Sequence, residues 1–294
     1  MPSHTPLFRR AVLAASALIG AGALMLPAAA TQAQTAPAVT KPAPAPSMAQ
    51  ILADPRRKDD TARDKYRHPA QTLAFFRVKP GMTVVDYMPS GGWWTRILVP
   101  YLGENGHYIG LNPDVSKDGE QTRNFLGGLA NSFPAKAAEY TGVPVERLPA
   151  YNTDGLPAAL NGTVDRVLIF REMHNLWRGN WMRRELLAIH GLLKPDGLLG
   201  IEQHRAKPGA PAARTIGNDG YLRERDVIAM VEAHGFELVA KSEVNANPRD
   251  PANHPEGVWM LPPFLRGAKT DADRARMTAI GESDRMTLLF RKRP

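Results

Sequence analysis

Seven short apolar runs, separated by stretches with helical periodicity, are the feature that most restricts the fold of this chain. The runs are residues 82–88, 107–112, 145–152, 164–170, 197–203, 236–244 and 284–292. Between them, residues 94–102, 180–193 and 223–234 carry apolar side chains at the spacing of amphipathic helices. Strands that alternate with helices predict a parallel α/β sheet with helices on both faces.

The segment between the sixth and seventh runs is long for a connection inside a sheet. Residues 245–282 are rich in Pro, Asn and Asp. Loops of this length usually carry function or are disordered, so the segment is a candidate part of a site. Before it, Gly235 is well placed to cap the helix expected at 223–234.

The N-terminal part of the chain is expected to lie outside this fold. Arg9 and Arg10 precede an uncharged apolar stretch at 11–25, and small residues follow at 27–33. This pattern predicts a signal peptide at 1–33 and a periplasmic protein without a stable membrane span in its mature form. The alternative is an uncleaved anchor helix, although the apolar stretch is short for one. Residues 34–47 form a Pro/Ala-rich linker, which leaves 48–294 as the folded domain.

Composition excludes several classes of protein and site. The chain has no cysteine, so it has no disulfide, cysteine nucleophile or thiolate metal site. Its net charge of +8 is dispersed among acidic residues, so nucleic acid is not an expected partner. No metal site is predicted, because the histidines lack ligand spacing, and neither a Gly-x-Ser-x-Gly elbow nor a phosphate-binding loop occurs.

Three segments carry a resemblance to a known family. They are "RHPAQTLAFF" with "VKPGMTV" at 67–84, "GGWWTRIL" at 91–98 and "LKPDGL" at 193–198. Together they resemble class I S-adenosylmethionine-dependent methyltransferases, and more narrowly a set of exported bacterial predicted methyltransferases. The resemblance implies a Rossmann-like, seven-stranded, mostly parallel sheet whose last strand is antiparallel. It also implies S-adenosyl-L-methionine as the cofactor, bound across the carboxyl ends of the first strands.

The resemblance places cofactor-binding residues after the first strand. The candidates there are Asp86, Met88, Pro89, Ser90, Gly91 and Gly92. The family has glycines at the positions of Met88, Ser90 and Gly92, because glycine permits positive φ and close approach to a ligand. Met88 is expected to remove one such position. The loop therefore either still holds the methionine part of the cofactor by its backbone or serves only to pack a helix.

The resemblance also suggests contacts to the adenosine part of the cofactor. Asn112 stands where the family has an acid that binds the ribose hydroxyls, and an amide has one accepting oxygen for that task. Asn152, or Asp154 beside it, matches an acid near the adenine amine. The alternatives are a plain turn at Asn112 and an Asx-type turn at Asn152.

Catalytic candidates follow the fourth run. Methyl transfer requires a positioned acceptor and often a base that takes its proton. Glu172 and His174 are two residues apart and would share one face of an extended segment. The alternative is that His174 caps or packs at the start of the next helix. His204, at the end of the fifth run, is a further candidate for contact with the substrate.

Two functions are consistent with these observations. The first is a methyltransferase acting on a small-molecule or cell-envelope acceptor. The second is a non-catalytic binding or structural protein of the envelope on a degenerate methyltransferase scaffold. A nicotinamide cofactor fits less well, since Met88 and Ser90 also break that fingerprint. A cavity beside Asn112 and Asn152 favours the first function, and side chains filling that space favour the second; the acceptor and the oligomeric state are not specified.

Overall fold

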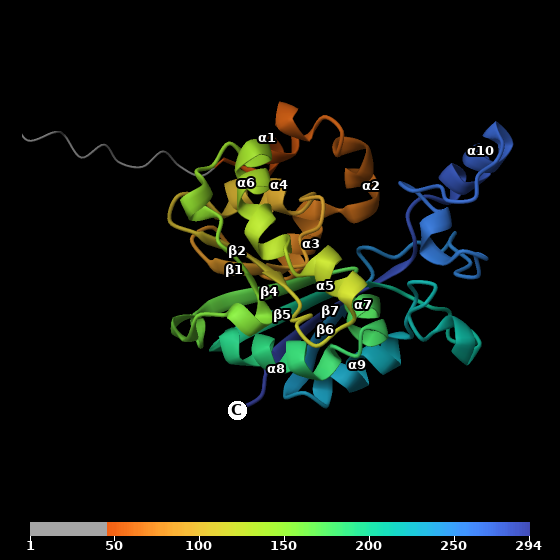
Figure 1. Cartoon of the computed structure of the whole chain (residues 1–294). Coiled ribbons are helices and arrows are strands. Elements are labelled where there is room, and N and C mark those ends of the chain that lie inside the picture. Colours follow the sequence, from red (N-terminus) through yellow and green to blue (C-terminus); the bar gives the residue numbers. More distant parts are fainter. Residues whose placement is uncertain (1–45) are drawn as a thin grey trace, which may run out of the picture. The chain divides into compact units, whose positions relative to one another are not determined.

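The computed structural model describes residues 46–294, and the predicted signal peptide and most of the predicted linker lie outside the described residues. Seven strands form one sheet in the order β3-β2-β1-β4-β5-β7-β6 (Figure 1). They are β1 (Thr83–Tyr87), β2 (His107–Asn112), β3 (Ala150–Asn152), β4 (Val164–Phe170), β5 (Leu193–His204), β6 (Phe236–Ser242) and β7 (Arg285–Lys292). The first five run parallel, and β7 pairs antiparallel with both β5 and β6. The predicted fold is confirmed, including its antiparallel last strand.

The third apolar run differs from its prediction. Only Ala150–Asn152 form a strand, and Val145–Arg147 form a 3-10 helix instead. Pro149 stands between the two elements. Proline lacks the N–H that a strand ladder needs, so β3 begins only after it.

Helices cover both faces of the sheet (Figure 1). On one face lie α1 (Met48–Leu52), α3 (Pro69–Phe75), α4 (Thr95–Leu102) and α6 (Leu129–Thr141), and on the other α7 (Met173–Arg178), α8 (Met182–Leu192) and α9 (Glu224–Glu232). The remaining helices are α2 (Asp64–Arg67), α5 (Glu120–Leu126) and α10 (Asp271–Ile280). Helix α9 ends earlier than the sequence predicts, with Ala233 as its C-cap residue, and Gly235 lies two residues further on with a left-handed φ of 92°.

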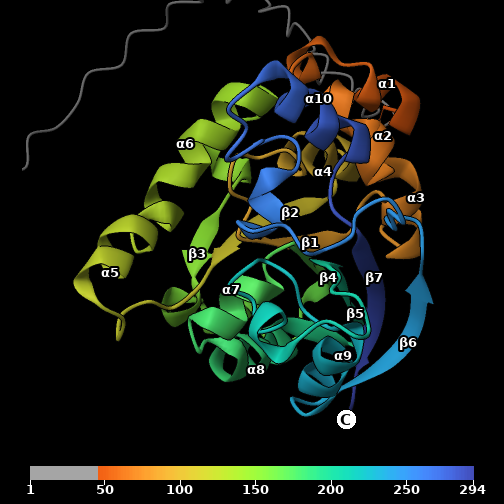
Figure 2. The ribbon, with the colours of Figure 1, turned by 90° about the vertical axis from the view of Figure 1, so that its right-hand side faces the viewer.

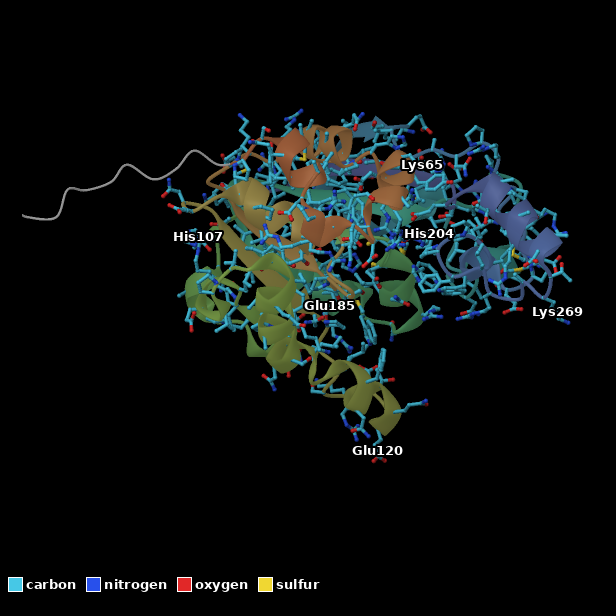
Figure 3. All side chains as sticks on the ribbon, turned by 90° about the horizontal axis from the view of Figure 1, so that it is seen from above. Lys65, His107, Glu120, Glu185, His204 and Lys269 are labelled. Atoms are coloured by element: carbon cyan, nitrogen blue, oxygen red, sulfur yellow. The ribbon has the colours of Figure 1, made fainter. Side chains whose placement is uncertain are left out.

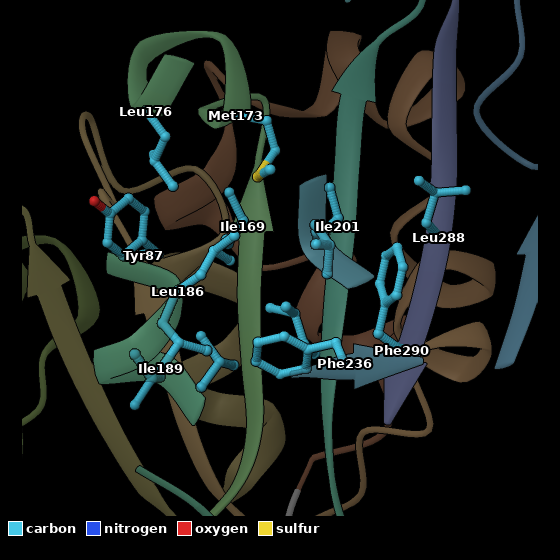
Figure 4. Packing of buried hydrophobic residues seen from close by; sticks show 14 of the residues in the cluster. Tyr87, Ile169, Met173, Leu176, Leu186, Ile189, Ile201, Phe236, Leu288 and Phe290 are labelled. Atoms are coloured by element: carbon cyan, nitrogen blue, oxygen red, sulfur yellow. The ribbon is translucent and has the colours of Figure 1, made fainter. Parts of the chain in front are cut away.

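The apolar faces of the strands bury against these helices. Figure 4 shows Ile169 of β4 and Ile201 of β5 packing with Leu186 and Ile189 of α8, and all four side chains are buried. Burying an aliphatic side chain of this size contributes about 1.5–3 kcal/mol. This packing holds the parallel strands side by side, so that their carboxyl ends meet at one edge, where open α/β sheets bind ligands.

The long segment before β7 is folded and anchored at both ends. The Asn245 side-chain amide donates to Thr72 Oγ1 at 3.0 Å and to Thr287 Oγ1 at 3.1 Å. Further along, α10 lies beside α2 (Figure 2). The two are close where α10 ends, because a Cβ added at Gly281 would lie 2.6 Å from the ring of Tyr66 in α2. Among residues 46–294, no helix is long and apolar enough to span a bilayer.

Candidate functional site

A cavity of about 1480 Å³ opens where β1 and β4 end. It is bordered by the β1–α4 loop, α5, the β4–α7 connection, the end of β5 and part of the 245–282 segment. Ligand pockets commonly measure about 300–1000 Å³, so this one has room for a cofactor and an acceptor together. Of the predicted residues, the cavity is lined by Asp86, Met88, Pro89, Ser90, Gly91, Glu172, His174 and His204.

The β1–α4 loop keeps a left-handed backbone at three positions. The φ angles are 52° at Met88, 50° at Ser90 and 73° at Gly92. The expectation that Met88 removes a positive-φ position is therefore wrong. Met88 holds this conformation because its N–H donates to the Leu111 carbonyl at 2.7 Å and its side chain packs on the core. Non-glycine residues with such angles are strained, and strain of this kind clusters at functional sites.

The two glycines of this loop have different surroundings. An added Cβ at Gly91 would meet nothing within 4 Å, whereas one at Gly92 would lie 2.2 Å from Tyr140 Oη. Gly92 therefore allows α6 to pack on the loop, and Gly91 leaves the cavity open. Within residues 46–294, the N–H groups of Ser90 and Gly91 have no backbone hydrogen-bond partner. Since α4 starts just beyond them, they lie where an anionic group is favoured.

Asp86 is a buried carboxyl at the wall of the cavity. Its Oδ2 accepts hydrogen bonds from Tyr108 Oη at 2.9 Å and from Thr95 Oγ1 at 3.4 Å. Burial raises the pKa of Asp86 to about 7, even though these two bonds favour the charged form. The negative charge of Glu172 adds to the rise, which indicates that the two acids are near each other.

Glu172 and His174 do not form the extended segment that the sequence suggested. The chain turns at Arg171, whose φ is 64°, and Glu172 is the N-cap residue of α7. His174 lies in the first turn of that helix. The prediction of a shared extended face is wrong, because a left-handed residue redirects the chain straight from β4 into a helix. Both side chains nevertheless line the cavity.

The charge states of these two side chains follow from burial. Burial raises the pKa of Glu172 to about 7, although Asn175 Nδ2 donates to its Oε2 at 2.5 Å. Burial lowers the pKa of His174 to about 4, and the charge of Arg178 adds to this. His174 Nδ1 is buried without a partner within residues 46–294. At neutral pH the His174 imidazole is therefore neutral, and the Glu172 carboxyl group is close to its own pKa.

His174 belongs to a cluster that the sequence did not reveal in full. Its ring centroid lies 5.7 Å from that of His204 and 6.1 Å from that of Trp259. His204 Nδ1 is 2.5 Å from Ser283 Oγ. Trp259 and Ser283 come from the chain between β6 and β7, and both line the cavity. Only the length of that segment pointed to a role for it.

The three residues expected near adenosine lie outside the cavity lining. Asn112 is 2% exposed, and its Nδ2 is buried without a partner within residues 46–294. Asn152 Nδ2 donates to the Gly127 carbonyl at 2.9 Å, and Asp154 is exposed in a short 3-10 turn.

Glu185 of α8, labelled in Figure 3, is fully buried. Its carboxylate accepts hydrogen bonds from Tyr87 Oη at 3.0 Å, the Asp114 N–H at 3.1 Å and Thr153 Oγ1 at 2.5 Å. These donors follow or end β1, β2 and β3 in turn. A buried side-chain network, rather than open space, therefore joins these strand ends.

The described part of the chain holds no group of three or more His, Asp or Glu side chains arranged to bind a metal ion.

The chain is similar to known proteins in structure but not in sequence. No protein-family model matches the chain. No curated protein matches it by sequence. Among solved structures, a SAM dependent methyltransferase from Aquifex aeolicus is 19% identical with a TM-score of 0.44, over 68% of this chain and 93% of that one. A putative sarcosine dimethylglycine methyltransferase from Galdieria sulphuraria is 11% identical with a TM-score of 0.48, over 82% and 91%.

A third structure, 1,6-didemethyltoxoflavin-N1-methyltransferase from Burkholderia thailandensis, contains S-adenosylhomocysteine. It is 14% identical with a TM-score of 0.46, over 86% of this chain and 94% of that one. The likeness at these identities concerns the fold alone. The strand order of the sheet, with its antiparallel β7, is the one that the resemblance in the sequence implies.

Proposed function

We propose that the chain is an S-adenosylmethionine-dependent methyltransferase whose cofactor lies over the β1–α4 loop. The observation that carries this proposal is the left-handed loop at Met88 and Ser90, which borders a cavity large enough for two ligands. The N–H groups of Ser90 and Gly91 would hold the carboxylate of the methionine part. When bound, the cofactor supplies an electrophilic methyl group on a sulfonium.

The chain's own residues would position the acceptor and take its proton. Glu172 and Asp86 both have pKa values raised to about 7, which suits a general base working near neutral pH. Of the two, Glu172 is the better base, because it accepts one side-chain hydrogen bond, from Asn175, whereas Asp86 accepts two, from Tyr108 and Thr95. His174 and Trp259 form the wall on the acceptor side.

One observation favours the second function, a non-catalytic binding protein on the same scaffold. Asn112 and Asn152 do not line the cavity, and the Glu185 network joins the strand ends beside them. A ribose contact at Asn112 would need those side chains to move. Cofactor binding measured directly separates the two functions.

Calorimetric titration of residues 48–294 with S-adenosylmethionine and S-adenosylhomocysteine tests the proposal. We expect micromolar binding, and we expect Gly91→Trp to weaken it by about 100-fold or more, which corresponds to roughly 2.7 kcal/mol. Gly91→Ala is the matched control, because an added Cβ there meets nothing within 4 Å and binding should change little. Absence of binding at millimolar ligand would favour the non-catalytic scaffold.

We further propose that the protein acts in the periplasm on a small-molecule or envelope acceptor. Support comes from the basic pair Arg9 and Arg10, the apolar stretch at 11–25 and the small residues after it. Cell fractionation with mass measurement of the full-length product tests this. We expect a periplasmic protein shortened by about 33 residues, and an uncleaved chain in the membrane fraction would instead indicate an anchor.

A further inference from the structure

Four arginines cluster at the cavity. Arg63, Arg67 and Arg171 line it, and Arg285 lies behind them at the start of β7. The Glu282 carboxylate forms ion pairs with Arg63 Nε at 2.6 Å, Arg67 Nε at 3.1 Å and Arg285 Nη1 at 3.1 Å. These cations come from helix α2, the turn before it, the β4–α7 connection and the start of β7.

Positive charge is in excess in this arginine cluster. The carboxyl groups facing it are Glu282, Glu202 and, beside Arg171, Glu172, and Glu202 Oε1 lies 2.7 Å from Arg285 Nη1. Four guanidinium groups against three carboxylates leave 4 − 3 = +1, and against two leave 4 − 2 = +2 when Glu172 is protonated. Burying uncompensated charge is costly, so a cluster of this kind is expected to have a further anionic partner.

The arginines also keep unused hydrogen-bond donors. Arg67 is fully buried, and its Nη1 and Nη2 have no partner within residues 46–294. The same holds for Arg63 Nη2 and Arg171 Nε. The Arg67 guanidinium lies 4.5 Å from the centroid of the Trp93 ring, which holds its plane in place while leaving the Nη donors free.

The cluster adjoins the histidines on the acceptor side of the cavity. Ser283, whose hydroxyl contacts His204 Nδ1, directly follows Glu282. Burial lowers the pKa of His204, with further contributions from His174, Arg171, Arg285 and Arg67. The Ser90–Gly91 donors belong to the separate β1–α4 loop.

We infer that Arg63, Arg67 and Arg171 bind a carboxylate or phosphate group, and that this group belongs to the methyl acceptor. Guanidinium groups recognise both anions through paired, charge-assisted hydrogen bonds. The anion site itself follows from the cluster, whereas its assignment to an acceptor rests on the proposed function. The substrate class is therefore a small anionic acceptor, whose reacting atom would lie near His174 and Glu172.

The anion site is tested without the cofactor. The probes are inorganic phosphate and succinate, titrated into residues 48–294 against sodium chloride of equal ionic strength. We expect saturable binding and a rise in the thermal midpoint with at least one probe, and the tighter probe identifies the preferred group. Arg67→Lys and Arg63→Gln should each weaken binding by about 10- to 100-fold, since each removes charge-assisted hydrogen bonds.

Arg205→Gln is the matched control. Arg205 is a partly buried arginine whose nitrogens are bound by Asp284, Glu224 and Glu243, and it does not line the cavity. Its variant should bind phosphate like the wild type. Phosphate binding should also persist in saturating S-adenosylhomocysteine, because in the proposed function the Ser90 and Gly91 N–H groups, and not the arginines, hold the carboxylate of the cofactor.

Three results would overturn the inference: no binding beyond the effect of ionic strength, unchanged binding in both cavity variants, or an equal loss in Arg205→Gln. Competition between phosphate and S-adenosylhomocysteine would also overturn it, since the arginines would then hold the cofactor's carboxylate. If phosphate binds as expected while S-adenosylmethionine does not, the anion site stands and the proposed methyltransferase function fails.

Discussion

Glu282→Gln should lower the free energy of unfolding by about 3–5 kcal/mol at pH 7, the usual cost of removing one partner from a buried ion pair. Glu282 is 3% exposed and is the carboxylate shared by Arg63, Arg67 and Arg285. Glutamine keeps the shape but removes the negative charge. Three guanidinium groups are then left close together with no shared counter-charge.

The pH dependence of this effect has a defined sign. Burial alone would raise the pKa of Glu282 from its ordinary 4.5, but the charges of Arg67, Arg285, Arg171 and Arg63 lower it to about 2. A depressed carboxyl pKa contributes stability that is fully present above the ordinary value. That stability is lost as the pH falls from about 4.5 through 2. The difference between wild type and variant should therefore shrink over this interval.

Urea unfolding of both proteins at pH 7 and at pH 3 measures this difference. Glu237→Gln is the control, because Glu237 pairs with Arg291 on the surface, with side chains 47% and 59% exposed. Exposed pairs contribute about 0–1 kcal/mol. A loss for Glu282→Gln no larger than that for Glu237→Gln would contradict the role given to the arginine cluster.

Local patterns in the sequence predicted the sheet well. Each apolar run contains a strand, because strand formation here depends on side chains that bury within the run itself. The failure at 145–152 is also local in origin, since Pro149 shortens β3. The loop at 88–92 was located from its position between a strand and a helix, but its backbone angles were not foreseen. Tertiary contacts at Met88 and Tyr140 fix those angles, and neither contact has a signature in the sequence.

The site was predicted only in part, because much of it is assembled from distant segments. Arg67 and Glu282 are separated by 215 residues, and nothing in either segment marks the other as its partner. Trp259 reaches the cavity from a segment whose path depends on anchors such as Asn245. Glu172 and His174 were found because they directly follow a strong strand, which places them at the edge where ligands bind.

Glu172→Gln should have the opposite effect on stability, raising the free energy of unfolding by about 1–3 kcal/mol at pH 8. Burial raises the pKa of Glu172 from 4.5 to about 7. The folded state therefore favours the protonated acid, and this contribution is present below about 4.5 and lost as the pH rises through 7. Above pH 7 the wild type holds a buried negative charge, which glutamine removes while still accepting the bond from Asn175.

The same substitution should reduce methyl transfer by about 10²- to 10⁴-fold, the usual contribution of a general base. Unfolding measured at pH 5 and pH 8 tests the stability change, and turnover of an anionic acceptor tests the catalytic one. Glu104→Gln, at an exposed position, should change neither. A stability gain without loss of turnover would make Glu172 a buried acid outside the reaction, and Asp86 would become the candidate base.

A destabilised variant at pH 8 would contradict the charge state assigned to Glu172. Because Glu172 and Glu282 line the same cavity, opposite signs for one type of substitution would separate a group held for chemistry from one held for structure.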